Sequence, residues 1–329
     1  MQSDYLFCAV PLYTKDAYWE IDGKGREVIM TPQEKIRRRI YFLRLALGKM
    51  PAGLILAVLL PHRLGKPILK IYGSLVRATV INLGLFKLAV KPGPQFYRLA
   101  VRQFMEILLP AFCGQSIMYE SGNVVLEKGD IVIDAGANLG VFSQFAAHKV
   151  GPSGRIYAFE PVSSSRELLI RTVRINNSKN IKVEPFALGN SCKELRVFTP
   201  PGEPHLSSAV FRAEVVETVK QITLDEFVRR ANTKVDFIKA NIEGMERELL
   251  EGAEETIRRF RPKIAISTSH LPDDPRVLRK MLKELAEEYE FLESDGMLYA
   301  RAAAQMLGAR NKEVGAEVSQ RLLLYHQEP

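Results

Sequence analysis

A glycine-rich loop after a short apolar strand is the feature that most constrains the fold of this chain. Residues 129–140 read Gly-Asp-Ile-Val-Ile-Asp-Ala-Gly-Ala-Asn-Leu-Gly and lead into a helical sequence. A strand that passes through such a loop into a helix is typical of a nucleotide-type cofactor site at the carboxyl end of a parallel strand. An ordinary tight strand-to-helix turn would use the same residues, so the loop alone leaves both interpretations open.

The spacing of the glycines separates two kinds of cofactor. Gly136 and Gly140 are expected where the backbone turns sharply and where a ligand comes close. The pattern D-x-G-x-N-x-G is not the G-x-G-x-x-G of dinucleotide-binding proteins, so an NAD-dependent oxidoreductase is disfavoured. A pyrophosphate requires N–H donors without a carboxylate nearby, whereas Asp134 suits a cofactor with a cationic centre.

A second apolar strand ends in another carboxylate. Residues 155–160 read Arg-Ile-Tyr-Ala-Phe-Glu, and Glu160 follows the glycine loop by about twenty residues, where such folds hold a ribose by its two hydroxyls. Glu160 is therefore the expected ribose ligand, although it could instead belong to the start of the helix that follows. A third strand, 181–188, ends in Ala187 and Leu188, which could flank an adenine ring.

The rest of the chain after Gly129 alternates strands with helices, as in a parallel sheet covered on both faces. Two extended pieces are expected between 194 and 223, around a proline-rich stretch that could form a lid, and a hairpin with Asp295-Gly296 at its turn is expected at 291–300. The elements predicted in between are strands 131–135, 155–160, 181–188, 235–242 and 263–268, and helices 139–150, 164–176, 224–231, 246–259 and 272–289.

From about Gly129 to about Ala300 the chain resembles the FkbM family of S-adenosylmethionine-dependent methyltransferases. The resemblance implies an α/β fold, the class I methyltransferase (Rossmann-like) fold, with a mostly parallel seven-stranded sheet and helices on both faces. Its motifs are Asp134-Ala-Gly-Ala-Asn-Leu-Gly140, Phe159-Glu160-Pro161, Ala187-Leu188-Gly189-Asn190, Ser207-Ser208, Thr223-Leu224-Asp225, Lys239-Ala-Asn-Ile-Glu243-Gly244 and Ile266-Ser-Thr-Ser-His270.

The resemblance also implies that the cofactor is S-adenosyl-L-methionine. The chain departs from the family pattern at two positions. Asn190 and Asn241 stand where the family usually has Asp, so each removes a negative charge from the expected cofactor and substrate side of the sheet. The expected cofactor-binding residues are Asp134, Gly136, Ala137, Asn138, Gly140, Glu160, Ala187, Leu188 and Asn241, and no metal site is predicted.

Methyl transfer to a hydroxyl needs an acceptor held in line and a base that takes its proton. His270 and Glu243 are the candidates for that base, with Lys239 as the ion-pair partner of Glu243. Alternatively, His270 could be a structural histidine at a strand end, and Glu243 could bind a metal, orient a sugar hydroxyl or begin the next helix. Ser207 and Ser208 are expected in a loop near the acceptor. The predicted reaction is O-methylation of a glycan, glycolipid or related metabolite, and the alternative is a catalytically degenerate binding protein.

The chain before the motif is basic and apolar. Residues 35–105 contain fourteen Lys or Arg and no Asp or Glu, while the remaining 32 basic and 38 acidic residues give the rest a formal charge of −6. Ile36, Ile40, Leu43 and Leu47 share one helical face, and no apolar run reaches the roughly 18 residues of a spanning helix.

Three interpretations of residues 35–105 stay open, namely peripheral contact with an anionic membrane, a helical cap with a solvated basic face, and nucleic-acid binding, which the interleaved aliphatic residues make the least suitable. We expect a basic helical element at 1–110, a methyltransferase domain at 111–305 and a helical tail at 306–329. Three scattered cysteines and the absence of a basic-apolar leader in residues 1–10 favour a cytoplasmic location, in part at the inner face of the membrane. The acceptor and the oligomeric state are not predicted.

Overall fold

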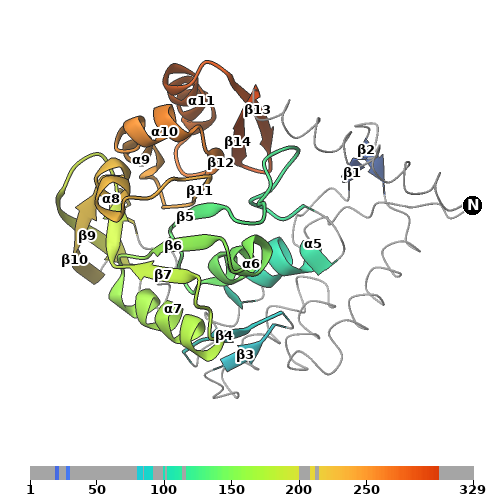
Figure 1. Ribbon diagram of the computed structural model, residues 1–329, viewed down its shortest axis with the longest axis vertical. Coiled ribbons are helices and arrows are strands. Elements are labelled where there is room, and N and C mark those ends of the chain that lie inside the picture. The colour runs from blue at the N-terminus through green and yellow to red at the C-terminus, as the bar shows by residue number, and fades with distance from the viewer. Residues whose placement is uncertain are drawn as a thin grey trace, which may run out of the picture.

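The computed structural model describes residues 19–21, 27–29, 80–83, 85–91, 99–100, 102–112, 116–199, 208–211 and 215–303. Its centre is a seven-stranded sheet of order β13-β14-β12-β11-β5-β6-β7 (Figure 1). Strands β12, β11, β5, β6 and β7 are parallel, and β14 runs antiparallel to both β12 and β13. This is the fold class predicted from the sequence, and the predicted closing hairpin is confirmed, with Asp295 and Gly296 at its turn.

The strands of this sheet are short and apolar. Five of them have no solvent-exposed residue after the first position, because helices cover both faces of the parallel part. Their bounds are Ile131–Ala135 (β5), Arg155–Phe159 (β6), Ile181–Glu184 (β7), Phe237–Ala240 (β11), Lys263–Ser267 (β12), Tyr289–Ser294 (β13) and Met297–Ala302 (β14).

Helices pack on both faces of the sheet (Figure 1). One face carries α6 and α7 and the other carries α8 to α11, so adjacent strand residues such as Val132 and Ile133 belong to different core clusters. The helices are α6 (Val141–Val150), α7 (Ser163–Ile175), α8 (Leu224–Ala231), α9 (Glu246–Glu251), α10 (Glu254–Phe260) and α11 (Asp274–Leu285).

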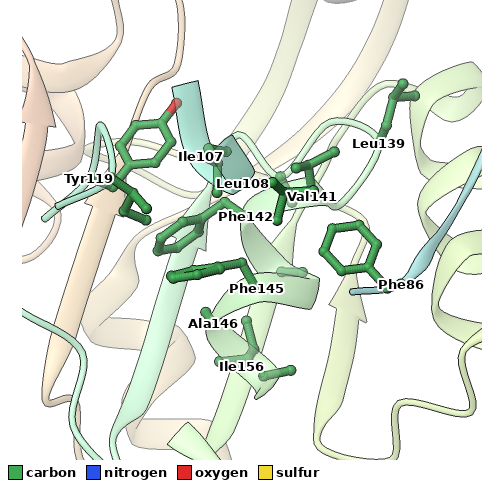
Figure 2. Close-up of a cluster of buried hydrophobic side chains, with 14 of the residues drawn as sticks. Phe86, Ile107, Leu108, Tyr119, Leu139, Val141, Phe142, Phe145, Ala146 and Ile156 are labelled. Atoms are coloured by element: carbon green, nitrogen blue, oxygen red, sulfur yellow. The ribbon is translucent and has the colours of Figure 1, made fainter. Parts of the chain in front are cut away.

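The N-terminal part contributes to the core beside α6. The π-helix η1 (Phe104–Leu108) continues into α5 (Leu109–Phe112), and strands β3 (Val80–Asn82) and β4 (Lys87–Ala89) form a separate hairpin. Figure 2 shows Phe86, Ile107 and Leu108 gathered with Phe142 and Phe145 of α6. Thr172 of α7 accepts the N–H of Ala89 through its hydroxyl and fixes this hairpin against α7.

Most of the predicted N-terminal element lies outside the described residues. Besides η1, α5 and the β3-β4 hairpin, the named elements among the described residues there are the paired strands β1 (Trp19–Ile21) and β2 (Glu27–Ile29). The expected helix at 36–47 and the tail at 306–329 are not among the described residues, and the predicted domain boundaries stay predictions. Within the described chain, no helix is long and apolar enough to cross a membrane.

Two predicted elements are divided in the structure. The strand expected at 181–188 breaks at Pro185, which has no N–H for a ladder. Its second half, β8 (Phe186–Leu188), pairs instead with β10 (Val215–Ile222), which also pairs with β9 (Lys193–Thr199). The helix expected at 246–259 is two helices separated at Gly252, where a Cβ would lie 1.9 Å from the carbonyl oxygen of Gly189.

Candidate active site

A cleft lies at the carboxyl ends of β5, β6 and β11, where ligands bind in open parallel sheets. Its wall comes from the glycine loop, the ends of β6, β8 and β11, and the π-helix from the N-terminal part. Lining residues include Arg102, Glu106, Tyr119, Gly136, Ala137, Asn138, Glu160, Ala187, Leu188, Lys239, Asn241 and Glu243. Nine of the twelve site residues predicted from the sequence therefore share this cleft, and Asp134, Gly140 and His270 are not among its lining residues.

A buried ion pair forms the floor of the cleft. Lys239 of β11 lies opposite Asp134 of β5 in the parallel register, and its Nζ is 2.9 Å from Asp134 Oδ1. Lys239 Nζ also donates to the carbonyl oxygens of Ala135 and Gly136, at 3.1 and 2.8 Å, and Ser143 Oγ donates to the other oxygen of Asp134. Burial alone would lower the pKa of Lys239, but Asp134, Tyr119 and Glu160 together outweigh this effect and raise the pKa.

This pairing corrects the expectation that Lys239 forms an ion pair with Glu243. All three protons of the Lys239 ammonium have acceptors on β5 and the glycine loop, so the side chain has no proton left for a substrate. Asp134 is fully buried and neutralised from below. It therefore holds the loop in place and does not itself present a carboxylate to the cleft.

The two loop glycines have positive φ angles of 77° at Gly136 and 89° at Gly140. A Cβ at Gly136 would lie 2.2 Å from the carbonyl oxygen of Asn241, and one at Gly140 would lie 2.5 Å from Leu169. The predicted sharp turn is present at both positions. The close neighbours, however, are a strand end and a helix of the protein.

Glu160 follows the last residue of β6 and is buried. Its two carboxylate oxygens accept the backbone N–H groups of Asn138, at 2.8 Å, and of Val162, at 2.9 Å. Burial raises the pKa of Glu160 to about 7, against the effect of these two hydrogen bonds. The side-chain Oδ1 of Asn138, which also lines the cleft, is buried without a hydrogen-bond partner among the described residues.

Glu243 lies at the opposite side of the cleft from Glu160, after β11. Its φ is 54°, and that of Gly244 is 101°, so the backbone turns sharply here. Its carboxylate is 3.7 Å from Nε2 of His270, whose Nδ1 is 2.9 Å from Glu246. Burial raises the pKa of Glu243, although His270 opposes this.

His270 lies behind Glu243, between two carboxylates. Burial alone would lower its pKa, but Glu246 and Glu243 together raise it. A raised pKa makes the neutral form of His270, the one that can accept a proton, less populated at a given pH. Of the two candidate bases, Glu243 is the one in the cleft.

Residues outside the predicted set also reach the site. Tyr119, Arg102 and Glu106 line the cleft from the segment before the glycine loop, where the sequence carries no motif. Ser208 donates to the carbonyl oxygen of Glu243 at 2.7 Å, whereas Ser207 is outside the described residues. Asn190 does not reach the cleft and binds Glu251 on the exposed surface.

No group of three or more His, Cys, Asp and Glu in the described part of the chain is arranged to hold a metal ion.

Part of the chain matches a known protein family. Residues 134–292 match the methyltransferase FkbM domain. The chain is 23% identical over 222 residues to the methyltransferase sdnD of Sordaria araneosa, covering 57% of this chain and 84% of that protein.

Among solved structures, the chain is similar to a methyltransferase FkbM from Methylobacillus flagellatus, with a TM-score of 0.42 and 18% identity over 63% of this chain and 54% of that one. It is also similar to Aeropyrum pernix fibrillarin, a structure with natively bound S-adenosyl-L-methionine, with a TM-score of 0.35 and 16% identity over 53% and 67% of the two chains.

The sheet order and the cleft define the class I methyltransferase fold. Residues 134–292 are a methyltransferase FkbM domain, so the family predicted from the motifs is confirmed. This part of the chain is therefore a methyltransferase domain, as the resemblance implied.

The Lys239–Asp134 pair can be tested by replacing one partner and then both. Lys239→Met leaves the charge of Asp134 buried and unpaired, and we expect it to lower the free energy of unfolding by roughly 3–5 kcal/mol. The double variant Asp134→Asn/Lys239→Met should recover a large part of this loss. Denaturant titration measures both values.

Lys263→Met is the matched control, because Lys263 is paired with Asp130 at 2.8 Å, is also buried, and is not in the cleft. Hydrogen exchange of the amides of residues 136–140 should accelerate in Lys239→Met and not in Lys263→Met. A double variant no more stable than Lys239→Met would contradict the buried-charge explanation.

Proposed function

We propose that this protein transfers a methyl group from S-adenosylmethionine to a hydroxyl oxygen of a glycan, glycolipid or related metabolite. The observation that carries the proposal is the pair of acidic groups at opposite sides of one cleft. Both residues line the cleft, and the proposal assigns ribose binding to Glu160 and proton transfer to Glu243. Both carboxyls are in a partly desolvated environment that raises their pKa.

The residues of the cleft fit the donor. Ala187 and Leu188 supply an apolar surface for an adenine ring, and Glu160 has acceptor capacity left after its two backbone hydrogen bonds. The buried Oδ1 of Asn138 is a further acceptor for a ribose hydroxyl. When bound, the donor supplies an electrophilic methyl group attached to a sulfonium.

The proton of the acceptor hydroxyl is assigned to Glu243. As the hydroxyl oxygen bonds to the methyl carbon and the carbon–sulfur bond breaks, the carboxylate of Glu243 accepts the proton. His270 opposes the effect of burial on the pKa of Glu243 and so favours the carboxylate form that accepts a proton, and Glu246 holds His270 in place. The left-handed backbone of Glu243, unusual for a residue other than glycine, is typical of strain kept at functional sites.

A catalytically degenerate binding protein is the alternative, and it rests on Asn190 and Asn241. Asn190 lies on the exposed surface, where its exchange for Asp would not alter the cleft. Asn241 is in the cleft, but its side-chain amide donates to Tyr119 and not to Glu160 or Glu243. Turnover of donor with a hydroxylated acceptor separates the two functions.

Donor binding should depend on pH through Glu160. A protonated carboxyl has lost one of its acceptor sites, so affinity for S-adenosylhomocysteine should rise as pH increases through about 7, where Glu160 ionises in the free protein. Glu160→Gln should weaken binding at pH 8 by about tenfold or more and remove this pH dependence.

Isothermal calorimetry between pH 6 and 8 measures both effects. Glu251→Gln, on the exposed surface, is the control and should leave the profile unchanged. Binding of NAD without binding of S-adenosylhomocysteine would overturn the proposed donor.

The assignment of the base predicts different effects for two variants. Glu243→Gln should lower turnover by about a hundredfold with little change in donor affinity, because the acceptor proton has lost its base. His270→Ala should lower turnover less at high pH and should move the acidic limb of the rate profile upward, since the pKa of Glu243 rises without the neighbouring cation.

Single-turnover rates with bound donor and saturating acceptor measure this, and donor affinity is checked in parallel. If His270→Ala abolishes turnover at every pH while Glu243→Gln stays active, the base is His270 instead.

For residues 35–105 we propose peripheral contact with an anionic membrane surface. Fourteen cations without an anion, interleaved with aliphatic residues, support this proposal. The whole chain should sediment with vesicles that contain phosphatidylserine and not with phosphatidylcholine vesicles, and binding should weaken between 50 and 500 mM salt, values of the order at which surface charges become screened. Equal recovery with both vesicles would favour a packed cap.

A further inference from the structure

Tyr119 brings an unused hydrogen-bond donor into the cleft. It is 6% exposed, and its ring packs edge-to-face on Phe142 with centroids 5.1 Å apart. The Lys239 ammonium lies 5.1 Å from the centre of the same ring. Figure 2 shows the hydroxyl of Tyr119 pointing away from Phe142 and Phe145. The packed ring therefore fixes the side chain, and the hydroxyl group faces the cleft that Tyr119 lines.

The segment that carries Tyr119 is fixed on two sides. The N–H of Met118 donates to the carbonyl oxygen of Glu106 in η1, at 3.0 Å. The hydroxyl of Tyr299 in β14 donates to the carbonyl oxygen of Met118, at 2.7 Å. A donor held on such a support costs little entropy when it binds a ligand.

Asn241 sets the direction of the Tyr119 proton. Its side-chain Nδ2 donates to the Tyr119 hydroxyl oxygen at 3.2 Å, so the phenol is an acceptor in this contact. The phenolic proton has no acceptor among the described residues, and burial raises the pKa of Tyr119, which keeps that proton in place. An aspartate at 241, as the family resemblance leads one to expect, could only accept and would take this proton itself.

The position of Asn241 and Tyr119 relative to the sheet indicates which part of the methyl donor they contact. In the strand order β11-β5-β6, Asn241 follows β11, the glycine loop follows β5 and Glu160 follows β6. Ala187 and Leu188 lie beyond Glu160 on β8. If adenine and ribose occupy the β6 and β8 side, the amino-acid part of the donor falls on the β11 side, near Asn241 and Tyr119.

That amino-acid part carries a carboxylate, which needs hydrogen-bond donors. Lys239 has used all its protons on β5 and the glycine loop. Arg102 lines the cleft but is half exposed and lies 3.8 Å from Glu106. We propose that the Tyr119 hydroxyl, oriented by Asn241, donates a hydrogen bond to the carboxylate of the amino-acid part of S-adenosylmethionine. Tyr119 is thus a positioning residue, and this inference rests on the proposed donor.

Three ligands isolate the carboxylate in a calorimetric test with the whole chain. S-adenosylhomocysteine has both the carboxylate and the ammonium, its decarboxylated analogue lacks only the carboxylate, and 5′-methylthioadenosine lacks both. Tyr119→Phe should weaken S-adenosylhomocysteine binding about tenfold or more and leave the other two ligands unchanged, so that the preference for the carboxylate disappears.

Asn241→Asp provides an independent arm. An aspartate there should accept the phenolic proton and repel the ligand carboxylate, so this variant should prefer the decarboxylated analogue. Tyr289→Phe is the matched control, because Tyr289 is equally buried, donates to the carbonyl oxygen of Pro262 and is not in the cleft. Its ligand preferences should equal those of the wild type. Thermal unfolding without ligand reports on the fold of each variant.

An unchanged preference for S-adenosylhomocysteine in Tyr119→Phe would overturn the inference and leave the proposed donor intact. So would an equal loss of all three ligands, since Tyr119 would then support the shape of the cleft. If the wild type binds none of the three, the proposed function fails as well.

Discussion

The cleft depends on one buried ion pair. Asp134 and Lys239 are register partners on adjacent parallel strands, and both are almost inaccessible to solvent. Two charges out of water are costly unless every hydrogen-bonding position is filled. Here Ser143 and three acceptors fill them, and two of those acceptors are carbonyl groups at the start of the glycine loop. The pair therefore joins β5, β11, α6 and the loop at one point.

The pairing of Asp134 with Lys239 also affects the pKa values of the two carboxyl groups in the cleft, Glu160 and Glu243. Because Lys239 is committed to Asp134, it contributes only a weak stabilisation to Glu160 and Glu243, and for both groups burial is the largest effect on the pKa. Each carboxyl then keeps a pKa nearer to neutrality than an exposed glutamate would have. Such groups can change protonation during a reaction, which a strongly paired carboxylate cannot do.

The sequence was sufficient for the sheet and for most of the residues around the cleft, because strand ends at one edge of a parallel sheet must meet. It placed Glu160, Ala187, Leu188, Asn241 and Glu243 together from their positions after apolar strands. Which side chains form pairs could not be predicted from the sequence. Lys239 and Glu243 are four residues apart in sequence, yet the partner of Lys239 is 105 residues away, since the direction of a side chain depends on the register between strands.

Tyr119 is a cleft residue that could not be predicted from the sequence. It precedes the first strand of the domain, in a turn with no motif, and reaches the cleft only because Met118 is held by both η1 and β14. The departure at Asn241 was visible in the sequence as a lost charge. Its chemical consequence is visible only in the contact between Asn241 and Tyr119. An aspartate at 241 would accept the phenolic proton of Tyr119, whereas the amide of Asn241 donates to the phenol oxygen and leaves that proton available for a ligand. Replacing the aspartate by Asn241 therefore removes a negative charge from the cleft and also makes the Tyr119 hydroxyl a hydrogen-bond donor for a ligand.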